Sequence, residues 1–463
     1  MNVIWIVADT FRKDHLGAYG HPTIRTPALD ALAARSVRFD RHYAAGFPTM
    51  PARADFFLGR WSMSFMQWGP LPPSAVPLAQ MLSKAGFHTA AVADTPFFIR
   101  HDMNYDRGFQ NFVFISGQEG SNTRLKVDYH HESRDVRHER RYESDLNAPR
   151  TITRAMEWLE LHYREDFFLY IDTWDPHEPW DAPAYYTEPF WPGFDGEEIQ
   201  PPYGFWQNYA DFSAERVQKA HASYCGEIGM VDTWIGYLLQ RVENMGLNEN
   251  TVIIFTSDHG FYFGEHDGWL GKLSLGLKPD GTRYRMGDPG ASWDFSPLYE
   301  ELVAAPLLIQ APGIAPATYG GLTSAVDLMP TVLDAMGQTP PAIVEGRSLW
   351  PRVADPSLAG REFVVSGIPF ANPGDAVRSV DDTNRTLMTS LETTVTTDEW
   401  ALIYSVEAGY SELYHLPTDP GQAQNLIGTR PEIARELHAM LVRFMEETNV
   451  APALAEPRAV LRL

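Results

Sequence analysis

The sequence contains a single cysteine, Cys225, among 463 residues. One thiol cannot form an intramolecular disulfide or a metal site with several thiolate ligands, so both are excluded. Basic residues are also few, because 37 Lys and Arg face 60 Asp and Glu and leave a formal net charge of −23. This balance opposes binding to nucleic acid, whose phosphates are held largely by Lys and Arg. An anionic small molecule would have to be bound by local groups, against the field of the whole chain.

Long apolar runs are missing as well. No run approaches the roughly 20 apolar residues that span a bilayer, so we expect no membrane partner. The chain opens directly on a short apolar segment, without the basic leader and cleavage site of a signal peptide, and we expect a cytoplasmic location. With 44% hydrophobic and 21% charged residues, the composition is typical of a folded globular protein.

The order of apolar and helical segments predicts an α/β fold. Short apolar runs alternate with stretches of helical periodicity, which is the pattern of a mostly parallel sheet flanked by helices. The helices expected from this periodicity cover residues 27–34, 77–85, 152–162, 214–245, 327–336 and 431–448.

A second, smaller domain is expected at the C-terminus. The Pro-rich stretch 338–351 breaks the α/β pattern, and strand-like segments at 362–366, 386–397 and 400–405 then precede the last helix. We therefore predict a catalytic domain over residues 1–355 and a small α+β domain over residues 356–463.

Polar side chains follow four of the predicted strands. They are Asp9, then Asp94 with Thr95, then Asp172, Asp175 and His177, and finally Asp258 with His259. The carboxyl ends of parallel strands meet at one edge of a sheet, where open α/β folds place their sites. A divalent cation there would neutralise carboxylates that otherwise repel one another. Alternatively, Asp9 caps a helix and the Asp258–His259 pair is an ordinary hydrogen-bonded edge.

The segment 46–60 suggests a nucleophile beside an anion-binding arginine. Pro51 fits the first turn of a helix, which places Thr49 just ahead of the positive end of that helix. A hydroxyl there is easier to ionise, especially against a metal, and Arg53 one turn later can hold an oxyanion. The alternative is a threonine cap followed by an arginine on the solvent face.

This segment resembles the signature of the sulfatase family of the alkaline phosphatase superfamily. In that signature, a Cys or Ser, one residue, Pro, one residue and Arg precede a turn that ends in Gly-Arg. Further segments resemble the family in the same order along the chain: residues 2–20, 26–30, 258–272, 326–331 and 413–426. The resemblance implies an alkaline phosphatase-like fold, a small anionic ester as substrate and hydrolysis of its ester bond.

One departure from the family concerns the nucleophile. Sulfatases oxidise the signature Cys or Ser to formylglycine, but Thr49 occupies that position and a secondary alcohol cannot give this aldehyde. Cys225 lies far along the chain from the signature, so no formylglycine is expected. Thr49 would then act directly, as threonine does in related nucleotide pyrophosphatases, which favours phosphoric or phosphonic mono- or diesters.

A second departure concerns the metal ligands. Thr10 stands where many sulfatases have another Asp, and His259 replaces their common Asn. The resemblance implies one divalent ion held by Asp9, Thr49, Asp258 and His259. This set favours manganese or zinc, with calcium as an alternative, and is closest to the phosphonate monoester hydrolase and phosphodiesterase branch. A second ion would need further ligands, for which Asp175 and His177 are the candidates.

The resemblance also implies roles around the substrate. His177 matches the family's substrate histidine and would protonate the leaving alkoxide, while Lys272 matches its anion-contacting lysine. Together with Arg53 they would compensate the charge of the transition state. Thr95 and His266 are the expected substrate-binding residues.

Other functions and segments stay open. The chain is alternatively a sulfuric ester hydrolase with an atypical nucleophile, a catalytically silent binding protein, or a transferase that passes the group from Thr49 to an alcohol. The eleven aromatic residues between Trp180 and Phe212 would form an apolar wall for a leaving group or pack an insertion. The insertion 274–297 is expected to be a lid or a contact in a homo-oligomer, and the His- and Arg-rich run 128–141 has the same two interpretations or is a solvated loop.

Overall fold

The computed structural model describes residues 1–95, 98, 103–115, 141–285, 288, 293–378, 385–387 and 392–463. Most of the run 128–141 therefore lies outside the described residues, as do parts of the insertion 274–297 and of the strand expected over 386–397.

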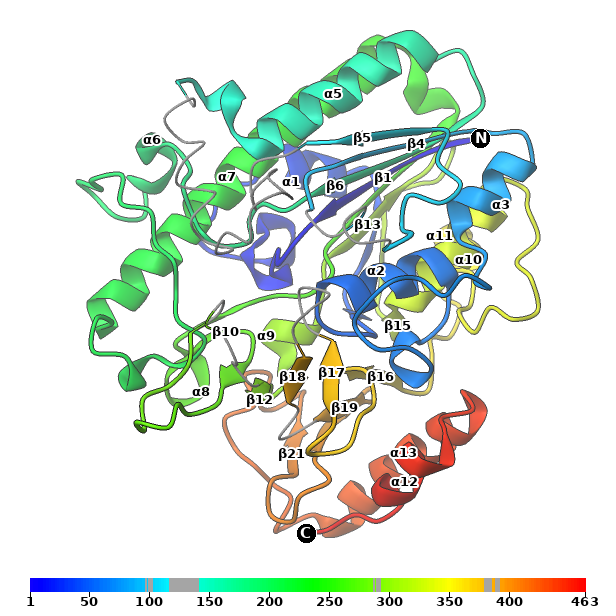
Figure 1. Ribbon diagram of the computed structural model, residues 1–463. Coiled ribbons are helices and arrows are strands. Elements are labelled where there is room, and N and C mark those ends of the chain that lie inside the picture. The colour runs from blue at the N-terminus through cyan, green and yellow to red at the C-terminus, as the bar shows by residue number, and fades with distance from the viewer. Residues whose placement is uncertain are drawn as a thin grey trace.

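The centre of the described structure is an eight-stranded mixed sheet, ordered β14-β2-β13-β8-β1-β6-β4-β5 (Figure 1). Its strands are β1 (Asn2–Ala8), β2 (Val37–Phe39), β4 (His88–Ala93), β5 (Asn111–Phe114), β6 (Phe167–Thr173), β8 (Thr251–Thr256), β13 (Leu307–Gln310) and β14 (Ala317–Tyr319). β1 pairs in parallel with β6 and β8, and β4 pairs in parallel with β5 and β6, whereas β13 runs opposite to β8 and β2. The predicted large, mostly parallel sheet is confirmed.

Helices cover both faces of this sheet (Figure 1). One layer contains α1 (Pro27–Ala33), α5 (Asn147–His162) and α7 (Ala214–Asn244). The other contains α2 (Thr49–Leu58), α3 (Leu78–Lys84), α10 (Leu328–Ala335) and α11 (Trp350–Ala354). The helix α5 starts five residues before the predicted residue 152, since Pro149 lies in its first turn, where a missing N–H costs no helical bond.

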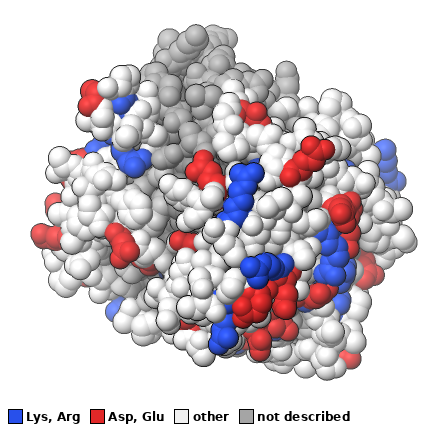
Figure 2. Space-filling model, turned by 90° about the horizontal axis from the view of Figure 1, so that it is seen from below, with Lys and Arg blue, Asp and Glu red and all other residues white. Residues whose placement is uncertain are grey.

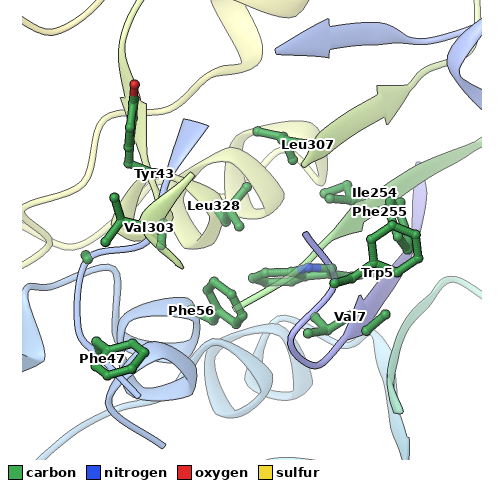
Figure 3. Packing of buried hydrophobic residues seen from close by; sticks show 14 of the residues in the cluster. Trp5, Val7, Tyr43, Phe47, Phe56, Ile254, Phe255, Val303, Leu307 and Leu328 are labelled. Carbon is green, nitrogen blue, oxygen red and sulfur yellow. The ribbon is translucent and has the colours of Figure 1, made fainter. Parts of the chain in front are cut away.

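The core forms where these layers meet (Figure 3). All seven residues of β1 are buried, as expected for a central strand covered on both faces. The ring of Trp5 on β1 lies 5.3 Å from that of Phe56 on α2 and 5.5 Å from that of Tyr170 on β6. These contacts hold α2, which carries the signature segment, firmly against the sheet.

A separate antiparallel sheet follows near the C-terminus. It is ordered β16 (Val364–Gly367), β19 (Thr393–Thr396), β20 (Trp400–Tyr404) and β21 (Glu412–His415). The helix α12 (Pro431–Glu447) packs on β19 and β20, and the short α13 (Pro452–Ala455) follows it. Leu402 and Leu441 belong to the same cluster of buried hydrophobic residues as the large sheet. The smaller α+β unit is present, and its boundary at residue 355 stays a prediction.

The charged surface is mixed where it is visible. On the face in Figure 2, Lys and Arg side chains lie beside Asp and Glu side chains. No helix of the described residues is long and apolar enough to cross a bilayer.

Candidate active site

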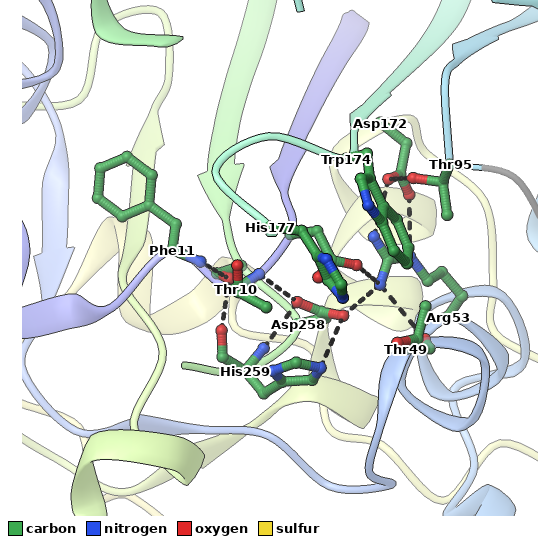
Figure 4. A network of polar contacts seen from close by, with 12 residues as sticks. Thr10, Phe11, Thr49, Arg53, Thr95, Asp172, Trp174, His177, Asp258 and His259 are labelled. Atoms are coloured by element: carbon green, nitrogen blue, oxygen red, sulfur yellow. Dashed lines mark hydrogen bonds and ion pairs between the residues drawn. The ribbon is translucent and has the colours of Figure 1, made fainter. Parts of the chain in front are cut away.

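Four strand ends of the central sheet meet at one edge, as the sequence predicts (Figure 4). β1 delivers Asp9, β4 delivers Thr95, β6 delivers Asp172 and β8 delivers Asp258, and each of these side chains is at most 1% exposed. Buried carboxylates need partners, because an isolated charge is costly in a protein interior.

Asp9, Asp258 and His259 form a compact cluster at this edge. One potential ligand atom from each lies within 4.8 Å of the others. The backbone N–H groups of Thr10 and His259 donate to Asp258 Oδ1, at 3.1 and 2.9 Å. His259 Nδ1 lies 2.9 Å from the carbonyl oxygen of Gly260, which can only accept, so Nδ1 carries the proton. The lone pair of His259 Nε2 is therefore free to bind a cation.

Unpartnered atoms in this cluster show that it fits a divalent cation. Among the described residues, both Asp9 oxygens, Thr10 Oγ1 and His259 Nε2 are buried without a hydrogen-bond partner, although Asp9 Oδ2 makes an ion pair with Arg53. Burial and the charge of Asp258 raise the pKa of Asp9 well above its usual value. A divalent ion would give the unpartnered atoms a ligand contact and would offset the repulsion between Asp9 and Asp258. Two carboxylates with one imidazole suit manganese or zinc.

Thr10 is a residue that sequence reasoning set aside. The sequence shows it as the replacement for an aspartate of the family pattern, but its buried Oγ1 lies at the start of the loop after β1 without a hydrogen-bond partner among the described residues. A threonine hydroxyl has lone pairs as well as a proton, so its oxygen can face a bound cation.

Thr49 is joined to the cluster through Arg53 (Figure 4). Thr49 begins α2, is 5% exposed, and accepts a hydrogen bond at its carbonyl from Arg53 Nη1 at 3.4 Å. Its φ of 30° is unusual for a β-branched residue, and such strain is typical of functional sites. The structure brings Thr49 to the expected helix start, and its roles as nucleophile and ligand stay predictions.

Arg53 is fully buried, so it does not lie on a solvent face. Its Nη1 forms an ion pair with Asp9 at 2.8 Å and also contacts Asp258. Its Nε and Nη2 donate to the two oxygens of Asp172, at 3.1 and 2.8 Å. Three carboxylates thus hold the guanidinium, and one of its two Nη2 protons is used by Asp172.

Asp172 is the partner of Arg53 that sequence reasoning did not assign. The sequence pattern identifies it as a polar residue after a predicted strand and gives it no role. In the structure the hydroxyls of Tyr170 and Thr95 also donate to it, and Tyr170 does so at 2.6 Å. Thr95 therefore lies in the site, where it orients Asp172, and its contact with substrate stays a prediction.

Lys272 and His177 form a second pair of predicted site residues. Lys272 Nζ donates to His177 Nε2 at 2.7 Å, and His177 Nδ1–H donates to the carbonyl of Glu178 at 2.6 Å. The imidazole stacks on Trp174 with ring centroids 3.9 Å apart. Burial and the neighbouring Lys272 lower the pKa of His177 well below its usual value. The geometry agrees with this direction, because the imidazole donates through Nδ1 and accepts from Lys272 at Nε2.

Two further expectations receive less support from the geometry. His266 stacks on Tyr299 at 3.7 Å and its Nε2 lies 3.1 Å from Glu301, so its partners differ from those of the cluster. Asp175 accepts a hydrogen bond from the backbone N–H of Ala148. Asp175 and His177 do not belong to any group of three potential metal ligands among the described residues. Substrate binding by His266 and a second metal ion stay predictions.

The aromatic segment between residues 180 and 212 is largely packed into the fold. Trp180 is 1% exposed and lies edge-on to Phe261, and Tyr203 is 1% exposed and donates to Glu178. Glu178 is the residue whose carbonyl orients His177. Through Glu178, the packed aromatic segment therefore helps to position His177.

Comparison with known proteins agrees with this geometry. The Sulfatase family model matches residues 1–338. The ulvan-active sulfatase of Formosa agariphila is 26% identical over 96% of this chain and 81% of its own length, and the arylsulfatase of Clostridium perfringens is 24% identical over 96% of this chain and 94% of its own length. The crystal structure of the phosphonate monoester hydrolase of Agrobacterium radiobacter superimposes with a TM-score of 0.73 at 20% identity, covering 96% of both chains.

Enzymes of this superfamily depend on divalent metal ions, which agrees with the unpartnered atoms of Asp9 and His259. The family match extends over most of the chain, and its relatives hydrolyse ester bonds. The chain therefore belongs to the sulfatase family of the alkaline phosphatase superfamily and is an ester-bond hydrolase.

Proposed function

We propose that this enzyme hydrolyses phosphoric or phosphonic mono- or diesters, with Thr49 as the nucleophile. The observation that carries the proposal is a threonine at the start of α2, one turn from Arg53 and the carboxylate cluster. A threonine cannot supply the aldehyde that expels sulfate in the family's oxidised-residue mechanism. A direct ester intermediate on Thr49 must instead be opened by water, a route that is well suited to phosphorus.

The first step forms a bond between Thr49 Oγ1 and phosphorus while the bond from phosphorus to the leaving oxygen breaks. The positive end of α2 favours the ionised hydroxyl. The leaving alkoxide takes a proton from the Lys272–His177 pair, in which Lys272 is the donor. Thr49 attacks as the alkoxide, after its hydroxyl proton has passed to solvent. Water then attacks the phosphothreonine, its proton returns to this pair, and Thr49 leaves again as the alkoxide.

The remaining groups of the site hold charge in place. Arg53 and Lys272 offset the negative charge that develops on the non-bridging oxygens. Asp9, Asp258 and His259, with Thr49 as a proposed fourth ligand, would hold one divalent ion, manganese or zinc. Such an ion supplies Lewis-acid polarisation of the ester and makes an alcohol easier to ionise.

Sulfuric ester hydrolysis is the second candidate function. The family model and the relatives from Formosa agariphila and Clostridium perfringens favour it, since both are sulfatases by name. In this case the same residues would bind a sulfate ester, and Thr49 would have to give up sulfate to water.

A substrate panel separates the two candidates. Metal-replete enzyme is assayed on an aryl phosphate, an aryl phosphodiester, an aryl phosphonate and an aryl sulfate, alongside Thr49→Ala and Thr49→Ser. We expect turnover of a phosphorus ester that Thr49→Ala reduces by at least 10³-fold and that Thr49→Ser partly retains. The melting temperature of Thr49→Ala serves as the folding control.

Mass spectrometry gives an independent readout, because a phosphothreonine trapped at acid pH adds a phosphoryl group to the peptide that contains Thr49. Turnover of aryl sulfate alone, unchanged in Thr49→Ala, would overturn the proposal. Transfer of the group to an added alcohol instead of water would convert the assignment to a transferase.

A further inference from the structure

A second group of potential metal ligands lies outside the candidate active site. His15, in the short 3-10 helix Lys13–His15 after β1, meets His221 and Cys225 on α7. One ligand atom of each lies within 4.8 Å of the others. His221 and Cys225 are four residues apart, so they share one face of α7. His15 and Cys225 are 4% and 2% exposed.

The distances in this group resemble those of a zinc site. His221 Nε2 lies 3.7 Å from Cys225 Sγ and 2.7 Å from His15 Nε2. Around a tetrahedral zinc ion, with bonds of about 2.0–2.1 Å to nitrogen and about 2.3 Å to sulfur, these separations would be roughly 3.6 and roughly 3.3 Å. The sulfur distance therefore already fits, and the two imidazoles need to part by a little over half an ångström.

The proton arrangement also suits a metal. His15 Nδ1 lies 2.9 Å from Asp14 Oδ1, which accepts, so Nδ1 is protonated and the lone pair of Nε2 faces His221. A carboxylate behind a histidine is the usual support of a zinc-binding imidazole. His221 Nε2 is therefore the donor of the hydrogen bond to His15 Nε2, and its proton moves to His221 Nδ1 when an ion takes its place.

The surroundings allow a cation in this place. Arg12 is the nearby positive side chain, and its guanidinium is engaged by Asp14 and Glu265. Phe263 packs against His221 at 5.1 Å and Tyr224 packs against His15 at 5.4 Å, so the ligands are fixed by aromatic contacts. His221 is the partly exposed member of the group, which leaves the fourth position to a water molecule.

We propose that His15, His221 and Cys225 bind a zinc ion that is structural and separate from the candidate active site. The ion would join α7 to the segment that follows Asp9 and Thr10. Tyr224 of α7 already contacts this segment, because its hydroxyl donates to the carbonyl of Thr10 at 2.7 Å. When zinc binds, the thiol proton of Cys225 is released to solvent and a zinc–sulfur bond forms.

Cobalt provides a direct test, because Cys225 is the single cysteine of the chain. Full-length protein stripped of metal is titrated with Co²⁺, and the near-ultraviolet thiolate-to-cobalt charge-transfer band is recorded. Cobalt at the Asp9 cluster gives no such band, so the signal reports this site alone. We expect the band to saturate by two equivalents, since the Asp9 cluster can take the second ion without adding to the signal, and to disappear when Zn²⁺ is added.

Variants identify the ligands. Cys225→Ser is expected to abolish the band, and His15→Ala and His221→Ala to weaken cobalt binding at least tenfold, whereas His259→Ala keeps it. If an alanine variant fails to fold, Asp14→Asn leaves all three ligands and should weaken binding by roughly 10–100-fold. Folded wild-type protein without the band at millimolar Co²⁺, or a band unchanged in His15→Ala and His221→Ala, would overturn the proposal.

Discussion

Arg53 depends on Asp172 for its position. Asp172 binds Arg53 through both of its oxygens and is itself held by the hydroxyls of Tyr170 and Thr95. Two parallel N–H···O bonds fix the plane of a guanidinium as well as its place. Asp172, near the end of β6, therefore sets the orientation of Arg53 toward Asp9 and Asp258.

Replacing Asp172 by Asn should misplace Arg53 without removing it. We expect Asp172→Asn to lower kcat/KM by roughly 10²-fold, because a charged hydrogen-bonded pair of about 2–3 kcal/mol is lost from a buried network. Tyr170→Phe removes one donor to the same carboxylate and is the matched control, with a loss of less than tenfold. Equal effects of the two variants in steady-state kinetics would contradict the role of Asp172.

Asp55 gives a prediction about stability and pH. It is buried in α2, accepts from the backbone N–H groups of Gly46 and Ser62, and burial raises its pKa to about 7 from 3.8. Between pH 4 and 7 the folded chain thus keeps a proton that the unfolded chain has lost. This group therefore lowers stability as pH rises through that window, by at most about 1.4 kcal/mol per pH unit.

Asp55→Asn cannot lose this proton. The melting temperature of the variant relative to wild type should rise steadily between pH 5 and 7.5, as measured by calorimetry. A constant difference across this range would show that Asp55 is already ionised in the folded protein.

Sequence pattern predicts the strand ends better than it predicts side-chain partners. The apolar runs of β1 and β8 are clear in the sequence. The position of Asp9, Asp258 and His259 at the carboxyl edge of the sheet was therefore predictable. Asp172 and Tyr170 are separated by one residue in β6, and side chains alternate between faces of a strand. Whether Asp172 faces Arg53 depends on this alternation and on the placement of α2, which are properties of the packed structure.

At the scale of elements, the loop after β8 is packed against α9 (Glu300–Val303). Gly260 follows His259, and its N–H donates to the carbonyl of Leu302 at 2.8 Å. A Cβ at Gly260 would lie 2.0 Å from the carbonyl oxygen of Glu301. Only glycine allows the backbone that carries the Asp258–His259 pair to approach this closely.

Gly260→Ala should therefore displace the ligand loop. We expect a loss of about 1–3 kcal/mol in stability from overpacking, seen as a lower melting temperature, together with weaker binding of the catalytic divalent ion. Gly428→Ala is the matched control, since a Cβ there meets nothing within 4 Å. A Gly260→Ala variant as stable as Gly428→Ala would show that the neighbouring carbonyl moves aside.

The C-terminal sheet also supports the site. Gly367 of β16 accepts from the N–H of Phe47 at 2.9 Å and donates to the carbonyl of Ala45 at 2.8 Å. These residues directly precede Thr49. The Pro-rich stretch 338–351 and the strand-like segments after it predicted a C-terminal unit. The pairing of β16 with the signature segment joins residues more than 300 positions apart, so it depends on tertiary packing.

The whole molecule is strongly acidic, whereas the candidate site holds two buried cations beside its carboxylates. The net charge is −23, and the cations that face the site are Arg53 and Lys272. Long-range fields act on a substrate before it enters, and salt reduces their range from about 30 Å at 0.01 M to about 8 Å at 0.15 M. Short-range contacts inside a buried site are screened much less.

Added salt should therefore help an anionic substrate to reach this enzyme. We expect kcat/KM for a dianionic ester to rise several-fold between about 10 and about 150 mM NaCl, because screening weakens the repulsion by the acidic surface. A monoanionic ester is the matched control, and its rise should be about half as steep on a logarithmic scale. A fall of kcat/KM with salt would show instead that Arg53 and Lys272 steer the substrate over a longer range than the acidic surface repels it.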